Sequence, residues 1–228
     1  TADGTKVLDY LLGRGLTRET LERFEIGMAP EGWDNGISYL KEKGYEEKEL
    51  LQAGVASERE SGGIFDRFRN RIMIPIRDSR GRMAGFGARV IDPDDVPKYL
   101  NSPQTVLFDK GHLLYGLDKA RKAIRMQDQA IIVEGYMDVI GLHQAGFENA
   151  VSPMGTAVSE AQLRTLKRFS RRIVLAMDAD LAGSQATLRG LSVARETLDR
   201  EPDPVFDARG LVRHEGRLDA EIRVLKLP

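Results

Sequence analysis

The chain has 228 residues, a formal net charge of −1 and no cysteine. This length is enough to bury a core without staples, and the absence of cysteine excludes a disulfide framework and a thiolate zinc site within the sequence. No apolar run approaches the roughly 20 residues that span a bilayer, so we expect a soluble, cytoplasmic protein with no membrane partner.

Residues 1–57 are expected to form a small helical module. An apolar face covers residues 7–12, and Thr17 is placed to cap a second helix. Further helices are expected over residues 36–43 and 46–53. Short helices joined by glycine turns can imitate a DNA-reading helix-turn-helix, but packing is the simpler interpretation, and we expect no sequence-reading helix here.

Two strands are expected next, over residues 71–77 and 83–90. The segment 78–81 between them is rich in turn residues, so the two strands should form a hairpin. Gly85 and Gly87 lie inside the second strand, where glycine predicts the close approach of another backbone or of a ligand.

A local basic excess lies in the same region. Residues 61–90 contain seven arginines and only two aspartates. Arginine favours bidentate contacts with phosphate, whereas a solvated strand face is the alternative interpretation. Beyond the hairpin, residues 98–103 are expected to be irregular and residues 117–127 helical.

From residue 128 the pattern alternates between strand and helix. This alternation predicts an α/β fold with a mostly parallel sheet and helices on both of its faces. Strands are expected over residues 130–134, near 150–151 and over 173–177, and helices from the first strand to residue 144, over 159–169 and over 182–199.

Two of these strands end in carboxylates. Glu134 and Asp138 follow the first, and Asp178 and Asp180 follow the last. Because the carboxyl ends of parallel strands border the ligand crevice, these groups should converge if the strands are neighbours. Clustered carboxylates repel one another unless a cation compensates, and oxygen ligands of this kind suit Mg²⁺ and phosphate chemistry. The alternative is that Asp178 and Asp180 only cap the following helix.

The segment 152–159 is expected to be a strand-to-helix turn. Its Gly155, Thr156 and Ser159 could present donors to a phosphate at a helix N-terminus. An ordinary turn with a serine N-cap would have the same sequence, so both interpretations stay open.

These motifs together give the chain a clear resemblance. The chain resembles the catalytic core of the bacterial replicative primase of the DnaG type, in which a TOPRIM domain follows a basic N-terminal subdomain. The resemblance covers nearly the whole chain and is carried by residues 66–77, 85–89, 98–103, 110, 114–117, 134–138, 155–157 and 178–183.

The resemblance implies a division of the chain and a function. It implies an α+β basic subdomain for template binding over residues 1–127 and a TOPRIM-type catalytic domain over residues 128–228. The implied activity is synthesis of short RNA primers on a single-stranded DNA template, from ribonucleoside triphosphates and with Mg²⁺ or Mn²⁺. The implied location is the cytoplasm, at the nucleoid and the replication fork, and nothing demands an oligomer, so a monomer is expected.

Site residues follow from the resemblance by motif. Glu134, Asp178 and Asp180 are implied as catalytic, and the same three with Asp138 as metal ligands, Glu134 serving as a ligand or a proton carrier. Gly155 and Thr156 match a phosphate-binding turn. The implied nucleic-acid and nucleotide contacts are Arg69, Arg71, Arg89, Lys98, Tyr99, Asn101 and Lys110.

The chain also departs from the family pattern. Asp178-Ala179-Asp180 stands where the family has Asp-Gly-Asp, which keeps both carboxylates. Residues 222–228 look like the strand before the family's third acidic motif, and the sequence then stops. The family's zinc domain and its region that binds the replicative helicase have no counterpart here. We therefore interpret the chain as a fragment and expect it to prime weakly or not at all.

Two alternatives remain. A TOPRIM-type nuclease would cleave a phosphodiester with the same metals. A non-catalytic module that binds single-stranded DNA would carry the same basic surface, with an acidic cluster that is only structural.

Overall fold

The computed structural model describes residues 2–92, 94–153, 157–177, 189–190, 192–193, 200–206, 212–218 and 220–226. The chain forms two compact units, Thr1–Asp109 and Lys110–Pro228. The division falls before the boundary expected at residues 127 and 128, because the elements from residue 114 onward join the sheet and core of the second unit. The assignment of template binding and catalysis to separate domains stays a prediction.

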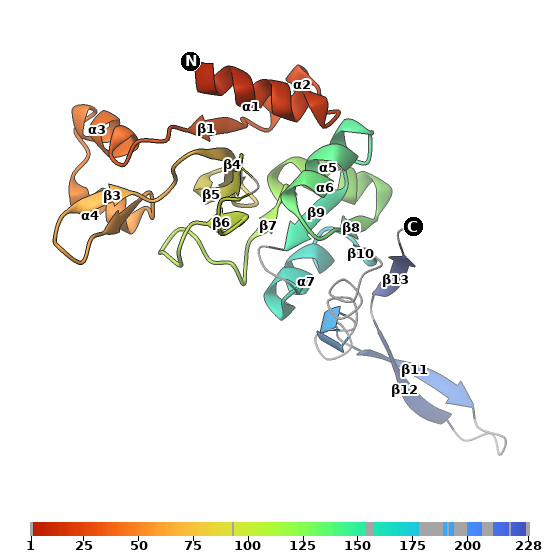
Figure 1. The fold of residues 1–228 in the computed structure, drawn as a ribbon. Coiled ribbons are helices and arrows are strands. Elements are labelled where there is room, and N and C mark those ends of the chain that lie inside the picture. Colours follow the sequence, from red (N-terminus) through yellow and green to blue (C-terminus); the bar gives the residue numbers. More distant parts are fainter. Residues whose placement is uncertain are drawn as a thin grey trace. The chain divides into compact units, whose positions relative to one another are not determined.

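The first unit begins with the expected helical module. Thr17 caps the second helix, since its side-chain oxygen accepts the N–H of Thr20 at 3.2 Å. Leu11, Leu21 and Phe24 are buried and form part of its core. The helices are α1 (Ala2–Gly13), α2 (Arg18–Arg23), α3 (Asn35–Glu42) and α4 (Glu47–Gln52), and β2 (Ala56–Glu58) pairs with β3 (Ile64–Asp66) after them (Figure 1).

A four-stranded sheet in the order β1-β4-β5-β6 completes this unit. The expected hairpin is confirmed: β4 (Arg71–Arg77) and β5 (Met83–Val90) are antiparallel, and Asp78 Oδ1 accepts the N–H groups of Arg80 and Arg82 in the turn. Two edge strands, β1 (Gly27–Ala29) and β6 (Tyr99–Asn101), were not expected. The expectation that residues 98–103 are wholly irregular is therefore wrong, because backbone pairing with β5 makes three of them a strand.

Gly85 confirms the close approach predicted for β5, although side chains make it. A Cβ at this position would lie 2.6 Å from Phe108 Cδ2 and 2.9 Å from Ser102 Oγ. Ser102 Oγ also accepts the N–H of Phe86 at 3.0 Å. The segment after β6 is thus packed onto the hairpin, and the expected backbone or ligand at Gly85 is replaced by Phe108 and Ser102.

A buried carboxylate organises the start of α3. Asp66, which is 6% exposed, accepts the N–H groups of Gly36 at 2.7 Å and Ile37 at 2.8 Å. Asp34, which stands at the N-cap position of α3, makes no side-chain capping hydrogen bond. Asp66 therefore satisfies helix-end donors that would otherwise be left without acceptors.

The second unit contains a five-stranded sheet in the order β13-β10-β8-β9-β7. The four strands β13, β10, β8 and β9 are mutually parallel, and β7 pairs with β9 in antiparallel orientation. The expected α/β fold with a mostly parallel sheet is confirmed. Its strands are β7 (Leu114–Tyr115), β8 (Ala130–Ile132), β9 (Ala150–Pro153), β10 (Arg172–Met177) and β13 (Glu221–Lys226).

Three described helices accompany this sheet. α5 (Leu117–Gln127) has the expected bounds, and α6 (Tyr136–Gln144) and α7 (Glu160–Lys167) lie where helices were expected. Leu117 and Ile124 of α5 and Leu163 and Leu166 of α7 share one apolar core with the strands, including the fully buried Ile132. This core fixes β8, β9 and β10 side by side.

The remainder of the second unit is described in part. The helix expected over residues 182–199 lies outside the described residues, except at 189–190 and 192–193, which are helical. β11 (Arg200–Phe206) and β12 (Val212–Leu218) form an antiparallel ribbon. Among the described residues, no helix is long and apolar enough to cross a membrane.

Candidate active site

The carboxyl ends of β8 and β10 lie at the same edge of the sheet. The two strands are adjacent and parallel, with Ala130 opposite Ile173 and Ile132 opposite Leu175. Glu134 comes two residues after the end of β8, and Asp178 directly follows Met177, the last residue of β10. The strands that carry the carboxylates are therefore neighbours, as the convergence of these groups requires.

Asp178 and Asp180 themselves lie outside the described residues. Their convergence with Glu134 therefore stays a prediction. Within the described part of the chain, which lacks residues 178–188, no three His, Asp or Glu side chains form a metal-binding group. A metal site at this edge depends on the two aspartates.

Glu134 and Asp138 stand at the junction of β8 and α6. Glu134 is half-buried, and its carbonyl oxygen accepts the hydroxyl of Ser152 on β9 at 2.8 Å. Asp138 is exposed, and its Oδ2 accepts the N–H of Gly135 at 2.9 Å, so it caps α6. Since the N-terminus of a helix carries partial positive charge, this end of α6 favours anionic groups at the same edge.

Tyr136 of the same motif is structural. Its side chain is buried, and its ring packs edge-on against Tyr115, with 4.9 Å between the ring centroids. Burial raises the pKa of the Tyr115 hydroxyl well above its ordinary value. The nearby Asp118 and Tyr136 raise this pKa further, by smaller amounts. Tyr115 therefore stays neutral, and the tyrosine pair anchors the start of α6 to β7.

The expected phosphate-binding turn is only partly described. Gly155 and Thr156 lie outside the described residues. Ser159 caps α7, because its Oγ accepts the N–H of Gln162 at 3.1 Å and donates to the carbonyl of Gly111. For Ser159 the observed contacts are those of an ordinary N-cap.

Gln162 was missed by sequence reasoning. Its side chain is buried, and its Nε2 donates to the carbonyl oxygens of Lys110 at 3.0 Å and Leu113 at 2.7 Å. These bonds hold the segment that carries Lys110, whose own side chain is exposed. The spacing Ser159-x-x-Gln162 is that of a capping box, and Gln162 Oε1 accepts the N–H of Ser159 at 2.8 Å, so this cap could have been predicted. The bonds of Gln162 to Lys110 and Leu113 have no such local signal.

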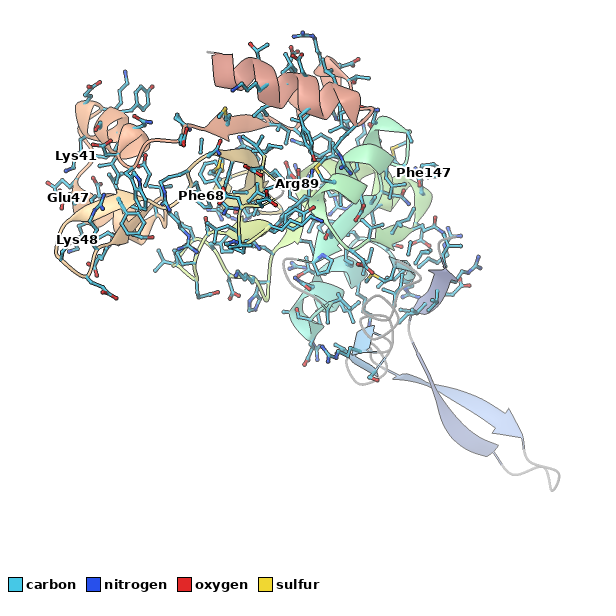
Figure 2. All side chains as sticks on the ribbon, in the orientation of Figure 1. Lys41, Glu47, Lys48, Phe68, Arg89 and Phe147 are labelled. Carbon is cyan, nitrogen blue, oxygen red and sulfur yellow. The ribbon has the colours of Figure 1, made fainter. Side chains whose placement is uncertain are left out.

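In the first unit, Arg89 lies between two tyrosine rings. Arg89 and Tyr99 are paired residues of β5 and β6, and Asn101 pairs with Gly87. The Arg89 Cζ is 5.5 Å from the Tyr10 ring centroid and 5.9 Å from that of Tyr99, and Arg89 also donates to the Tyr10 hydroxyl. Arg89 is labelled in Figure 2. Arg89 is 9% exposed, and its Nε has no hydrogen-bond partner among the described residues.

Arg71 supports this surface from inside. It is 6% exposed and donates to the carbonyl of Pro97 at 2.7 Å. That bond holds the residue just before Lys98, while the Lys98 ammonium lies 5.9 Å from the Tyr99 ring centroid. Arg71 thus positions Lys98 instead of presenting its own charge to solvent.

Arg69 belongs to a second aromatic site. Its Cζ lies 4.0 Å from the centroid of the Trp33 ring and 5.2 Å from that of Phe65. Burial lowers the pKa of Arg69, and the nearby Arg71 charge lowers it further. Trp33 is 54% exposed, so a flat apolar face reaches solvent beside the guanidinium. Trp33 and Tyr10 were both missed, although Trp33 is the only tryptophan in the chain.

Comparisons with known proteins identify both units. Residues 1–121 match the family model "DNA primase catalytic core, N-terminal domain", and residues 128–201 match the Toprim domain. A DNA primase of Deinococcus radiodurans is 53% identical over 186 residues, which cover 81% of this chain and 32% of that protein. The chain thus spans about a third of the length of such curated relatives.

Solved structures are similar over almost the whole chain. The Escherichia coli primase catalytic core superposes with a TM-score of 0.83 at 37% identity, covering 98% of this chain and 66% of that one. The structure of a DnaG primase catalytic domain bound to single-stranded DNA has a TM-score of 0.80 at 37% identity, with the same coverage of 98% and 66%. The chain therefore belongs to the DNA primase catalytic-core family, with a Toprim domain after the N-terminal domain of the core.

Proposed function

We propose that the chain is the nucleotidyl-transferring core of a primase. It adds ribonucleotides to a short RNA strand on a single-stranded DNA template. The observation that carries this proposal is the adjacent, parallel placement of β8 and β10, which brings the strand ends before Glu134 and Asp178 to one edge of the sheet. Membership of the primase family supports it.

The acidic residues would hold a divalent metal. Glu134, Asp138, Asp178 and Asp180 offer only carboxylate oxygens, which suit Mg²⁺ or Mn²⁺. The metal, when bound, lowers the pKa of the attacking 3′-hydroxyl and neutralises charge on the leaving pyrophosphate. Glu134 acts as a ligand or accepts the hydroxyl proton, and Gly155 and Thr156 orient the triphosphate from the turn after β9.

The basic residues of the first unit would bind template and nucleotide. Arg89 would reach a phosphate oxygen through the part of its guanidinium that stays exposed, because its Nε is buried. Lys98 and Asn101 flank Tyr99, which is 44% exposed and can stack on a base. Arg69 and Trp33 provide a second stacking surface, and Lys110 adds a cation in the second unit. The DNA-bound relative supports a single-stranded template.

Further partners follow from the same proposal. The substrates are ribonucleoside triphosphates, and the place of action is the replication fork. Contact with a replicative helicase would be made by segments other than those described here.

Incubation with single-stranded DNA carrying a short annealed RNA strand tests this function. With Mg²⁺ or Mn²⁺, we expect slow extension of the RNA strand that requires ribonucleotides and leaves the DNA intact. The control reaction omits nucleotides. Shortening of the DNA in that control would show a nuclease and contradict the proposal.

A further inference from the structure

A cluster of cations lies at the amino edge of the second-unit sheet, the edge opposite Glu134. There the segment between α5 and β8 meets the segment between α7 and β10. The N–H of Arg171 donates to Asp128 Oδ1 at 3.2 Å, and Arg172 Nε donates to the Asp128 carbonyl at 2.8 Å. These bonds join two segments that are more than 40 residues apart in sequence, 43 in the case of Arg171 and Asp128.

The chain is strongly basic around both connections. Residues 119–129, from α5 to the start of β8, and residues 164–172, from α7 to the start of β10, contain a single acidic residue, Asp128. We call the exposed cations of this region the amino-edge patch: Arg121, Lys122, Arg125, Arg168, Arg171 and Arg172. The chain as a whole has a net charge of −1, so this positive charge is a local excess.

Two members of the patch are held in place. Arg172 donates through Nε to the carbonyl of Asp128 at 2.8 Å and through Nη2 to the carbonyl of Gln127 at 2.9 Å. Arg125 lies over the Phe169 ring, with its Cζ 4.8 Å from the centroid. A guanidinium that is already held loses less conformational entropy when it binds an anion, so the patch is partly preorganised.

Favourable interaction with a helix dipole explains the position of only some of these cations. Arg125 stands in the last turn of α5, where a cation is favoured by the helix dipole. Arg171 and Arg172 lie beyond the end of α7 and gain little from it. Two carboxylates lie at the same edge: Asp128 forms an ion pair with Arg172 at 3.4 Å, and the N–H of Glu221 donates to the Arg171 carbonyl at 2.8 Å. A bound polyanion would neutralise the positive charge that exceeds these two carboxylates.

We propose that the amino-edge patch binds the phosphate backbone of the RNA–DNA duplex formed at the opposite edge of the sheet. This inference rests on the proposed function. β10 has 6 residues, so the two edges are roughly 20 Å apart. At the B-form spacing of about 3.4 Å per base pair, a growing product would reach the patch at about 6 base pairs, and slightly later for the more compact A-like hybrid. Five of the six cations are arginines, whose planar forks fit phosphate.

Binding of labelled RNA–DNA hybrids to the 228-residue chain, with Mg²⁺ and without nucleotides, tests the inference, because the length dependence needs one end of the hybrid at the acidic edge. The double variant Lys122→Glu with Arg168→Glu should weaken binding of a hybrid of about 12 base pairs at least roughly tenfold and leave a hybrid of about 5 base pairs within about twofold. The matched control, Lys43→Glu with Lys48→Glu, makes the same charge change on two exposed lysines, Lys43 at the C-cap of α3 and Lys48 in α4, and should alter neither.

The salt dependence gives a second readout. The neutral pair Lys122→Gln with Arg168→Gln should reduce the slope of log Kd against log salt for the longer hybrid by about 2, because each lost phosphate contact removes about 0.9. This pair also tests the inference if the charge-reversed variant proves unstable in thermal unfolding.

Three outcomes would overturn the inference. The first is that the patch variant weakens binding of the short and the long hybrid equally. The second is that the control pair weakens binding of the long hybrid as much as the patch variant does. The third is that an acidic peptide binds the unaltered chain and loses affinity in the patch variant while hybrid binding is unchanged, since the partner would then be a protein. Because the assay needs no catalysis, its failure leaves the proposed primer synthesis standing, and failure of primer synthesis leaves this result intact.

Discussion

Replacing Glu134 by glutamine should reduce ribonucleotide addition roughly 100-fold or more while leaving affinity for single-stranded DNA within about twofold. The change keeps the size of the side chain and its place after β8 but removes the negative charge that a divalent metal needs. Extension of an annealed RNA strand measures the first quantity, and fluorescence anisotropy with a labelled oligonucleotide measures the second.

A carboxylate at the other edge of the same sheet provides the control. Glu221 is exposed and pairs with Arg223 at 2.6 Å, so Glu221→Gln should change neither quantity noticeably. If the Glu134 variant retained full activity, Glu134 would be neither a metal ligand nor a proton carrier, and the role proposed for it would be wrong.

Replacing Asp66 by alanine should lower the free energy of unfolding of the first unit by roughly 2–4 kcal/mol. The buried carboxylate accepts two N–H groups at the start of α3, and alanine would leave both without an acceptor. Trp33 is the only tryptophan, and its carbonyl accepts the N–H of Asp66 at 2.7 Å, so its fluorescence reports unfolding at this place. Urea titration followed by this signal gives the loss.

Asp34→Ala is the matched control for this substitution. Asp34 has the N-cap position of α3 but makes no side-chain capping bond, so its loss should cost less than about 0.5 kcal/mol. Asp66→Asn, which keeps one acceptor oxygen, should fall between the two. Equal destabilisation by Asp34→Ala and Asp66→Ala would show that the cap assigned to Asp66 is wrong.

The long apolar elements could be predicted from the sequence. The runs that become β8 and β10 are mostly buried, and carboxylates follow both, so the type of these elements could be predicted from the pattern. The hairpin of β4 and β5 could be predicted from the turn residues between the two strands. β1 and β6 were missed because three residues are too few to show a period, and backbone pairing with β4 and β5 decides their conformation.

The roles of individual cations could not be predicted in the same way. Arg71 and Lys98 have the same charge, but a carbonyl 26 residues away holds Arg71 inside the fold. Likewise, Arg89 depends on Tyr10, which is 79 residues away. The amino-edge patch could not be predicted from the sequence, because its two halves come together only when β8 and β10 pair. Such roles come from long-range contacts, which a local pattern does not encode.

Diffraction from crystals of the chain soaked in Mn²⁺ tests the central claim most directly, because the anomalous signal locates the metal. The claim is that carboxylates from the ends of two neighbouring strands meet to hold a divalent cation. It predicts a peak that the carboxylates of Glu134 and Asp178 both contact, at about 2.0–2.2 Å. A peak elsewhere, or carboxylates of Glu134 and Asp178 that face opposite sides of the sheet with no metal between them, would contradict it.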